Sequence, residues 1–188
     1  MNKFVFLCVS LVIFSLNLFG QISANDLSLD KKSDILIRQR KVDDLADAKA
    51  GKPFSGLELE KKAFELLNAK RGEEGLLPLI WDDEVAKVAR IHSQNMADFN
   101  FFSHKGLDGM LVSDRADKIG LSKWRLIGEN IAYLRGYKNP VEFAVECWMK
   151  SASHKQNLLN KDWKQSAVGV AVTDNGTYYF TQVFLLRK

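Results

Sequence analysis

The chain has 188 residues, 27 Lys and Arg against 23 Asp and Glu, and a formal net charge of +4 at pH 7. Because the positive residues are spread out and form no Lys/Arg block, the sequence argues against nucleic-acid binding. Two cysteines exclude a disulfide-rich scaffold, so a packed apolar core has to stabilise the fold.

The N-terminal residues have the pattern of a secretory signal peptide. Lys3 precedes the almost wholly apolar run 4–19, and the segment 21–24 ends in the small residue Ala24. The run is shorter than the roughly 20 apolar residues that a spanning helix needs, and no second such run follows. We expect a signal peptide over 1–24, a secreted product, extracellular or periplasmic, and no transmembrane segment in the mature chain. Cleavage after Gly20 and a retained anchor are the alternatives.

The next segment, 25–55, mixes Asp with Lys and Arg, has few aromatic residues and includes Gly51-Lys52-Pro53. This composition predicts a charged tether or loosely packed segment. The folded domain is then expected over 56–188. It retains Cys147 alone, which excludes an internal disulfide.

Apolar residues at helical spacing predict three helices in the first half of the domain. One runs over about 57–71 and is ended by Gly72. A second opens after Trp81 with Asp82 as N-cap, and a third covers about 110–119.

A fourth helix is predicted from Asn139-Pro140 onward. Asn139 is expected to be its N-cap, Pro140 its first residue, and Glu142 the partner that completes a capping box. Trp148 falls on the apolar stripe of this helix, so we expect it in the core.

The C-terminal region changes to the period of β-strands. Two strands, 167–173 and 177–186, are joined by Asn175-Gly176, a strong hairpin signal. Both faces of these strands are poor in charge, so helices have to cover both faces. The sequence therefore predicts an α+β fold, a three-layer α-β-α sandwich around a mainly antiparallel sheet.

One carboxylate stands out in this framework. Residues 128–132 read as a strand whose period places Glu129 on the same face as apolar residues, so the carboxyl group needs a partner. His104, in the turn after the second helix, and His154, just past the fourth, are candidates. His92 lies on an apolar helix stripe and is expected to be a satisfied, partly buried histidine.

Two imidazoles and a carboxylate suit either a divalent-metal site or an acid/base pair. Their spacing does not choose between these readings, because the three residues are far apart in the chain. The sequence has no His-Glu-x-x-His motif and no Gly-x-Ser-x-Gly elbow.

An ordered series of motifs resembles the bacterial branch of the CAP superfamily. This superfamily comprises cysteine-rich secretory, antigen 5 and pathogenesis-related 1 proteins, and its domain is also called SCP-like. The resemblance covers about residues 57–186. The motifs are Leu66-Leu67-Asn68-Ala69-Lys70-Arg71, Leu77-Pro78-Leu79-Ile80-Trp81, Phe102-Ser103-His104, Gly128-Glu129-Asn130-Ile131-Ala132, Trp148-Met149-Lys150-Ser151 with His154 and Asn157, and Gly169-Val170 before Tyr179-Phe180-Thr181-Gln182.

The resemblance implies an α-β-α sandwich with a central cleft that gathers histidines and acidic residues and binds a divalent ion in some members. His104 and Glu129 match the cleft His and Glu. Ser151 and Tyr179 stand where plant and animal members carry a second Glu and a second His. His154 matches a histidine of the bacterial branch and is expected to supply the second imidazole. The expected cleft residues are His104, Glu129, Ser151, His154, Asn157, Tyr179 and Gln182, with His104, Glu129 and His154 as ligands of a divalent cation such as zinc.

The roles that the resemblance implies range from sterol and lipid binding to antimicrobial action and signalling, and no shared reaction defines the family. We expect a secreted, non-enzymatic CAP-domain protein whose cleft binds a divalent metal ion or a small ligand. One alternative is a hydrolase, such as a peptidase, in which Glu129 and a histidine activate water with or without metal. Another is a lipid- or envelope-binding module that uses the apolar surface near 99–102. The sequence assigns no catalytic residue, protein partner or oligomeric state.

Overall fold

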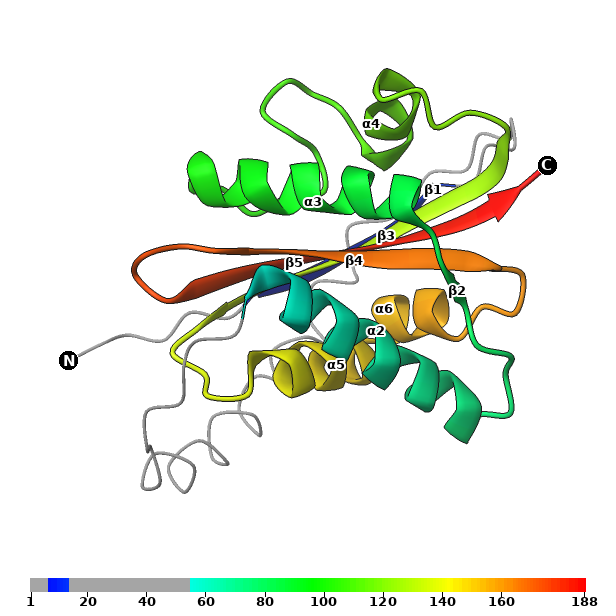
Figure 1. The fold of residues 1–188 in the computed structure, drawn as a ribbon, viewed down its shortest axis with the longest axis horizontal. Helices are drawn as coiled ribbons and strands as arrows, with labels where there is room; N and C mark the ends of the chain where they lie inside the picture. Colours follow the sequence, from blue (N-terminus) through cyan, green and yellow to red (C-terminus); the bar gives the residue numbers. More distant parts are fainter. Residues whose placement is uncertain (1–6, 14–54) are drawn as a thin grey trace. The chain divides into compact units, whose positions relative to one another are not determined.

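The structure, a computed structural model, describes residues 7–13 and 55–188, and side chains from residue 55 onward. Its strands form one five-stranded sheet in the order β1-β3-β5-β4-β2 (Figure 1). Three of the four strand pairings are antiparallel, and only β2 and β4 run parallel. The strands are β1 (Leu7–Ile13), β2 (Ile80–Trp81), β3 (Trp124–Arg135), β4 (Gln165–Val172) and β5 (Thr177–Arg187).

Helices cover the two faces of this sheet. On one face lie α3 (Asp83–Asp98) and α4 (Val112–Lys118), and on the other lie α2 (Gly56–Glu73), α5 (Pro140–Lys150) and α6 (Ala152–Leu158) (Figure 1). The predicted α+β fold, a three-layer α-β-α sandwich with a mainly antiparallel sheet, is confirmed. In the two described segments, no helix combines the length and apolar character needed to cross a membrane.

The alternation of β3 sorts its side chains between the two layers. Ile127 packs with residues of α3 and α4, whereas Ala132 and Leu134 pack with residues of α2, α5 and α6. Because neighbouring residues of a strand point to opposite faces, Glu129 lies on the α3 side and Asn130 on the α6 side. The predicted face of Glu129 is therefore confirmed by its apolar neighbours.

Local signals account for several element ends. Asp82 caps α3, its Oδ1 accepting hydrogen bonds from the backbone N–H groups of Glu84 and Val85 at 2.9 and 3.2 Å. The β4–β5 hairpin turns at Asn175-Gly176, where Gly176 has a φ of 77°, a value that favours glycine. Both features match the predictions from the sequence.

The start of α5 differs from the prediction. Pro140 is its first residue as expected, but the Asn139 side chain makes no capping hydrogen bond. Glu142 instead forms an ion pair with Lys62 of α2, at 2.6 Å between Nζ and Oε1. The predicted capping box is wrong because Glu142 pairs with a charge on the neighbouring helix.

The N-terminal predictions lie largely outside the described residues. Of the predicted signal peptide, the structure describes only β1, and of the predicted tether it describes only Ser55. Ser55 is the N-cap of α2 and forms a capping box with Glu58. Strand β1 pairs with β3, with Leu11 opposite Glu129. Cleavage of residues 1–24 stays a prediction.

Candidate functional site

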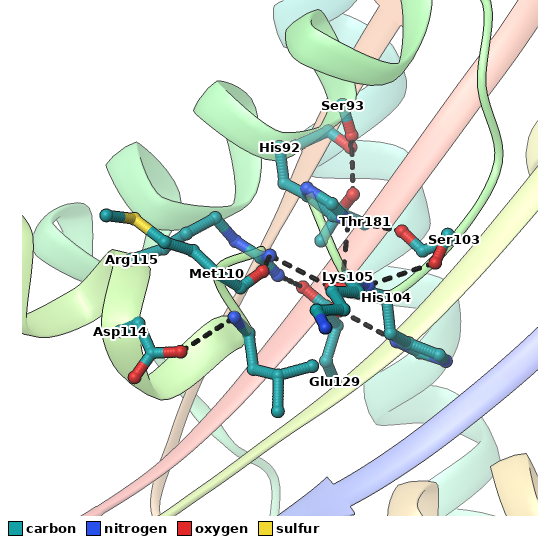
Figure 2. A network of polar contacts seen from close by, with 12 residues as sticks. His92, Ser93, Ser103, His104, Lys105, Met110, Asp114, Arg115, Glu129 and Thr181 are labelled. Carbon is teal, nitrogen blue, oxygen red and sulfur yellow. Dashed lines mark hydrogen bonds and ion pairs between the residues drawn. The ribbon is translucent and has the colours of Figure 1, made fainter. Parts of the chain in front are cut away.

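The Glu129 carboxylate lies fully buried in the middle of β3 and is held from two sides (Figure 2). His104 Nδ1 lies 2.7 Å from Oε1, and Arg115 Nη2 donates to Oε2 at 2.5 Å. Burial opposes ionisation of this carboxyl group, but the hydrogen bond from His104 and the charge of Arg115 outweigh it and keep the pKa of Glu129 below its ordinary value. Glu129 is therefore an anion with both oxygens engaged.

Arg115 also anchors the loop that carries His104. Its Nη1 donates to the backbone carbonyls of His104 and Met110, each at 3.0 Å (Figure 2). Asp114 accepts the N–H of Leu111 at 2.9 Å and so stabilises the start of α4, which carries Arg115. The loop between α3 and α4 is thereby fastened to β3.

The pairing with Glu129 defines the hydrogen-bonding state of His104. A ring nitrogen that faces a carboxylate oxygen at 2.7 Å carries the proton, so Nδ1 donates. The opposite nitrogen, Nε2, is buried and makes no hydrogen bond within the described residues, although the His104 residue is 6 % exposed. In the neutral imidazole this Nε2 is an unused acceptor.

His92 belongs to the same cluster, which the sequence analysis did not predict. Its Nε2 donates to the carbonyl of Ser103 at 2.9 Å and lies 4.0 Å from Glu129 Oε1, while Nδ1 is buried without a hydrogen-bond partner in the described chain. Burial is the main cause that lowers the pKa of His92 to about 4. His92 is therefore neutral at pH 7. We call His92, His104, Arg115 and Glu129 the charged cluster.

The histidine predicted as the second ligand lies elsewhere. His154 is in α6, a separate helix rather than the end of α5, and its backbone carbonyl accepts a hydrogen bond from Asn130 Nδ2 at 3.3 Å. Because Asn130 and Glu129 point to opposite faces of the sheet, the structure does not bring His154 to the Glu129 carboxylate. His154 lies in the first turn of α6.

Two of the four other predicted cleft residues, Asn157 and Gln182, lie on the same face of the sheet as His154. Asn157 Nδ2 donates to Asn130 Oδ1 at 3.0 Å, and Gln182 Nε2 donates to Ser166 Oγ at 3.2 Å. All four side chains are buried. We call Asn130, Asn157, Ser166 and Gln182 the amide cluster.

The two remaining predicted residues belong to neither cluster. Ser151 is the half-buried residue that precedes α6, with its Oγ 3.3 Å from Ser153 Oγ. Tyr179 lies on the α3 side of β5, packed edge-on against Tyr133 with 5.1 Å between ring centroids. The predicted set is therefore divided between the two faces of the sheet.

Sequence reasoning missed Arg115, although a signal for it exists. Val112, Arg115 and Ala116 have the i, i+3, i+4 spacing of one helix face, and all three are buried. An arginine within an apolar stripe has to meet a carboxylate, and Glu129 is a buried carboxylate that needs a cation.

The charged cluster does not fit the predicted divalent-ion site. Among the described residues, no group of three or more His, Cys, Asp or Glu side chains is arranged to hold a metal ion. Glu129 has no free oxygen, and the guanidinium of Arg115 places a fixed positive charge where a cation would bind. The same contacts prevent Glu129 from activating water as the hydrolase alternative requires.

An α-β-α sandwich with a buried His–Glu pair defines the class of protein, and comparison with known proteins agrees. The model of the cysteine-rich secretory protein family, CAP, matches residues 64–184, and the chain belongs to this family. YkwD of Bacillus subtilis is 38 % identical over 133 residues, covering 71 % of this chain and 49 % of that protein. YlbC, a membrane protein of the same organism, is 38 % identical over 130 residues, covering 68 % of this chain and 34 % of that protein. The chain thus spans half or less of the length of these relatives.

Solved structures show the same fold. An extracellular SCP-domain protein from Bacillus anthracis is 31 % identical with a TM-score of 0.59, covering 73 % of this chain and 45 % of that one. An outer surface protein of Borrelia burgdorferi has a TM-score of 0.65 at 24 % identity, covering 74 % of this chain and 100 % of that one, and supports the fold alone.

Proposed function

We propose that this chain is an exported CAP-domain binding protein that holds a small ligand at Nε2 of His104, without catalysis. The observation that carries the proposal is the state of this ring. Glu129 orients it through Nδ1 and leaves Nε2 as a buried acceptor without a partner in the described chain. An unsatisfied buried acceptor is unfavourable, and a ligand donor would satisfy it.

The surroundings favour a neutral ligand with an aromatic or other apolar ring. Arg115 already neutralises Glu129, so the pair has no excess charge to attract an ion. Close to His104 in the chain, Phe102 contacts Tyr133 with 5.9 Å between ring centroids, and Phe101 contacts His92 at 6.2 Å. These partly buried aromatic side chains can pack against a ring, while its hydroxyl or N–H group donates to Nε2.

Export rests on two supports. The predicted signal peptide provides a route across the membrane. The similar SCP-domain protein of Bacillus anthracis is described as extracellular. The predicted envelope-binding alternative has less support. It needs an exposed apolar surface at 99–102, but of the three phenylalanines there only Phe99, at 63 %, is largely exposed, whereas Phe101 and Phe102 are partly buried in the aromatic cluster.

Phenol is a suitable probe, since it combines one ring with one hydroxyl donor. We expect a phenol titration, followed by ¹⁵N NMR of histidine-labelled protein, to shift His104 Nε2 progressively and to saturate. The shift should be confined to His104 and should persist in His154→Gln, the matched variant on the opposite face. A titration that leaves His104 unchanged, or shifts both histidines alike, contradicts the proposal.

A second candidate is a hydrolase with His104 as general base, favoured by its pairing with Glu129. A carboxylate that holds the opposite ring nitrogen of a histidine is the arrangement that serves proton abstraction in other enzymes. Turnover of a peptide library that is lost in His104→Gln and retained in His154→Gln would favour this function over binding alone.

A further inference from the structure

Arg115 is nearly fully buried, 5 % exposed, in the layer between α4 and β3. Its guanidinium meets three acceptors from two segments of the chain: the Glu129 carboxylate of β3 at 2.5 Å, and the carbonyls of His104 and Met110 of the α3–α4 loop at 3.0 Å (Figure 2). It is the only Arg or Lys that forms an ion pair with Glu129 within the described residues.

The positive charge of the Arg115 guanidinium stabilises the buried carboxylate of Glu129. A buried carboxylate has to be compensated by a cation and by hydrogen bonds, and Arg115 supplies a charge and a donor to the same oxygen. The carboxylate then holds the Nδ1 proton of His104 on its other oxygen. A divalent ion could bind Oε2 only by displacing the guanidinium. An ion that bound beside the guanidinium would be repelled by the positive charge of Arg115.

We propose that Arg115 is the resident cation of this site, replacing the divalent ion that the family resemblance implies. It is a positioning residue. Through Glu129 it holds His104 in the tautomer that presents Nε2, so the site keeps its geometry without a metal. This inference concerns the same His104–Glu129 pair as the proposed ligand site, but its test uses no organic ligand, so either can fail without the other.

The decisive variant is Arg115→Ala, which removes the cation and leaves space for a replacement. We expect guanidinium chloride, far below denaturing concentrations, to raise the thermal midpoint of this variant and restore the ¹⁵N pattern of a His104 ring protonated at Nδ1. Zinc should bind the variant roughly tenfold or more tightly than the unmodified protein, because the competing charge is gone. The unmodified protein should show neither response.

Arg90→Ala is the matched control, since Arg90 likewise forms an ion pair with a buried glutamate, Glu60, but its own side chain is 40 % exposed. Neither guanidinium nor zinc should alter its His104 signals. If Arg115→Ala folds only when guanidinium is added, that result supports the proposal. Absence of guanidinium rescue in Arg115→Ala overturns it, as does binding of one zinc by the unmodified protein that is lost in His104→Ala.

Discussion

The two polar clusters on the two faces of the sheet differ in charge. The charged cluster contains an ionised carboxylate, a guanidinium and two imidazoles, and each imidazole has one buried nitrogen without a partner in the described chain. The amide cluster contains only neutral groups, and Gln182 Oε1 is its buried atom without such a partner. There, Asn157 joins α6 to β3 through the Glu129 carbonyl and Asn130.

This difference in charge indicates that the charged cluster is a functional site and that the amide cluster has a structural role. Neutral amides that bond to one another and to the backbone fasten a helix to a sheet at low electrostatic cost. Burying a charge pair beside acceptors that make no hydrogen bond lowers the stability of the fold. Arrangements of this kind occur mainly at sites that bind a ligand or carry out a reaction. Breaking each cluster in turn tests this distinction.

The largest effect is expected in the charged cluster. Arg115→Met should lower the free energy of unfolding by about 3–5 kcal/mol, because it leaves Glu129 buried without its cation. The double variant Arg115→Met/Glu129→Leu should recover most of this loss, since it removes both charges. Urea unfolding of the three variants, including Glu129→Leu alone, measures the coupling. Additive losses would contradict the pairing.

The next largest effect is a pH dependence caused by His92. Its pKa is lowered from 6.5 to about 4 in the folded protein, so the unfolded chain binds a proton first as the pH falls. The stabilisation is therefore present above pH 6.5 and is lost between about pH 6.5 and 4. It amounts to about 3 kcal/mol, since one pKa unit corresponds to about 1.4 kcal/mol.

Urea unfolding at a series of pH values measures this loss. In His92→Gln, which keeps a donor for the Ser103 carbonyl, stability should change little over the same range. Further loss below about pH 4.5 is expected in both proteins as Glu129, whose pKa is lowered, becomes protonated. An equal loss above pH 5 in both proteins would remove His92 as the cause.

A smaller effect is expected in the amide cluster. Asn157→Ala removes two buried hydrogen bonds and should cost about 1–3 kcal/mol in urea unfolding. The ¹⁵N signals of His104 should stay in place, because Asn157 supports the opposite face. A change in the His104 tautomer would show that the two clusters are coupled through β3.

The smallest effect is expected at the surface pair of Lys62 and Glu142, whose side chains are 46 % and 40 % exposed. Glu142→Gln should change the free energy of unfolding by about 0–1 kcal/mol, because solvent screens the pair. A larger decrease in the free energy of unfolding would show that Glu142 stabilises α5 through contacts other than its ion pair with Lys62.

Features that depend on neighbouring residues could be predicted from the sequence. Asp82 and the Asn175-Gly176 turn act within a few residues, and the period of the strand places Glu129 on its face. The pairing of Glu129 with His104 followed from the need of a buried carboxylate for a partner, and the resemblance supplied which histidine.

What could not be predicted depends on contacts distant in sequence. The place of His154 is determined by α6, which packs on the opposite face of the sheet from α3, and the period of the chain does not encode that choice. Arg115 was missed because its partner is 14 residues away and belongs to another layer. Glu142 has a good local partner in the sequence but pairs with Lys62 of α2 instead.

The most direct test of the account is a zinc titration of the unmodified protein followed by the ¹⁵N signals of His104. A ring held by Glu129 and Arg115 should show a protonated Nδ1 and an unprotonated Nε2, and zinc up to several equivalents should leave both unchanged. A stoichiometric shift of His104 that saturates near one equivalent of zinc would contradict the account.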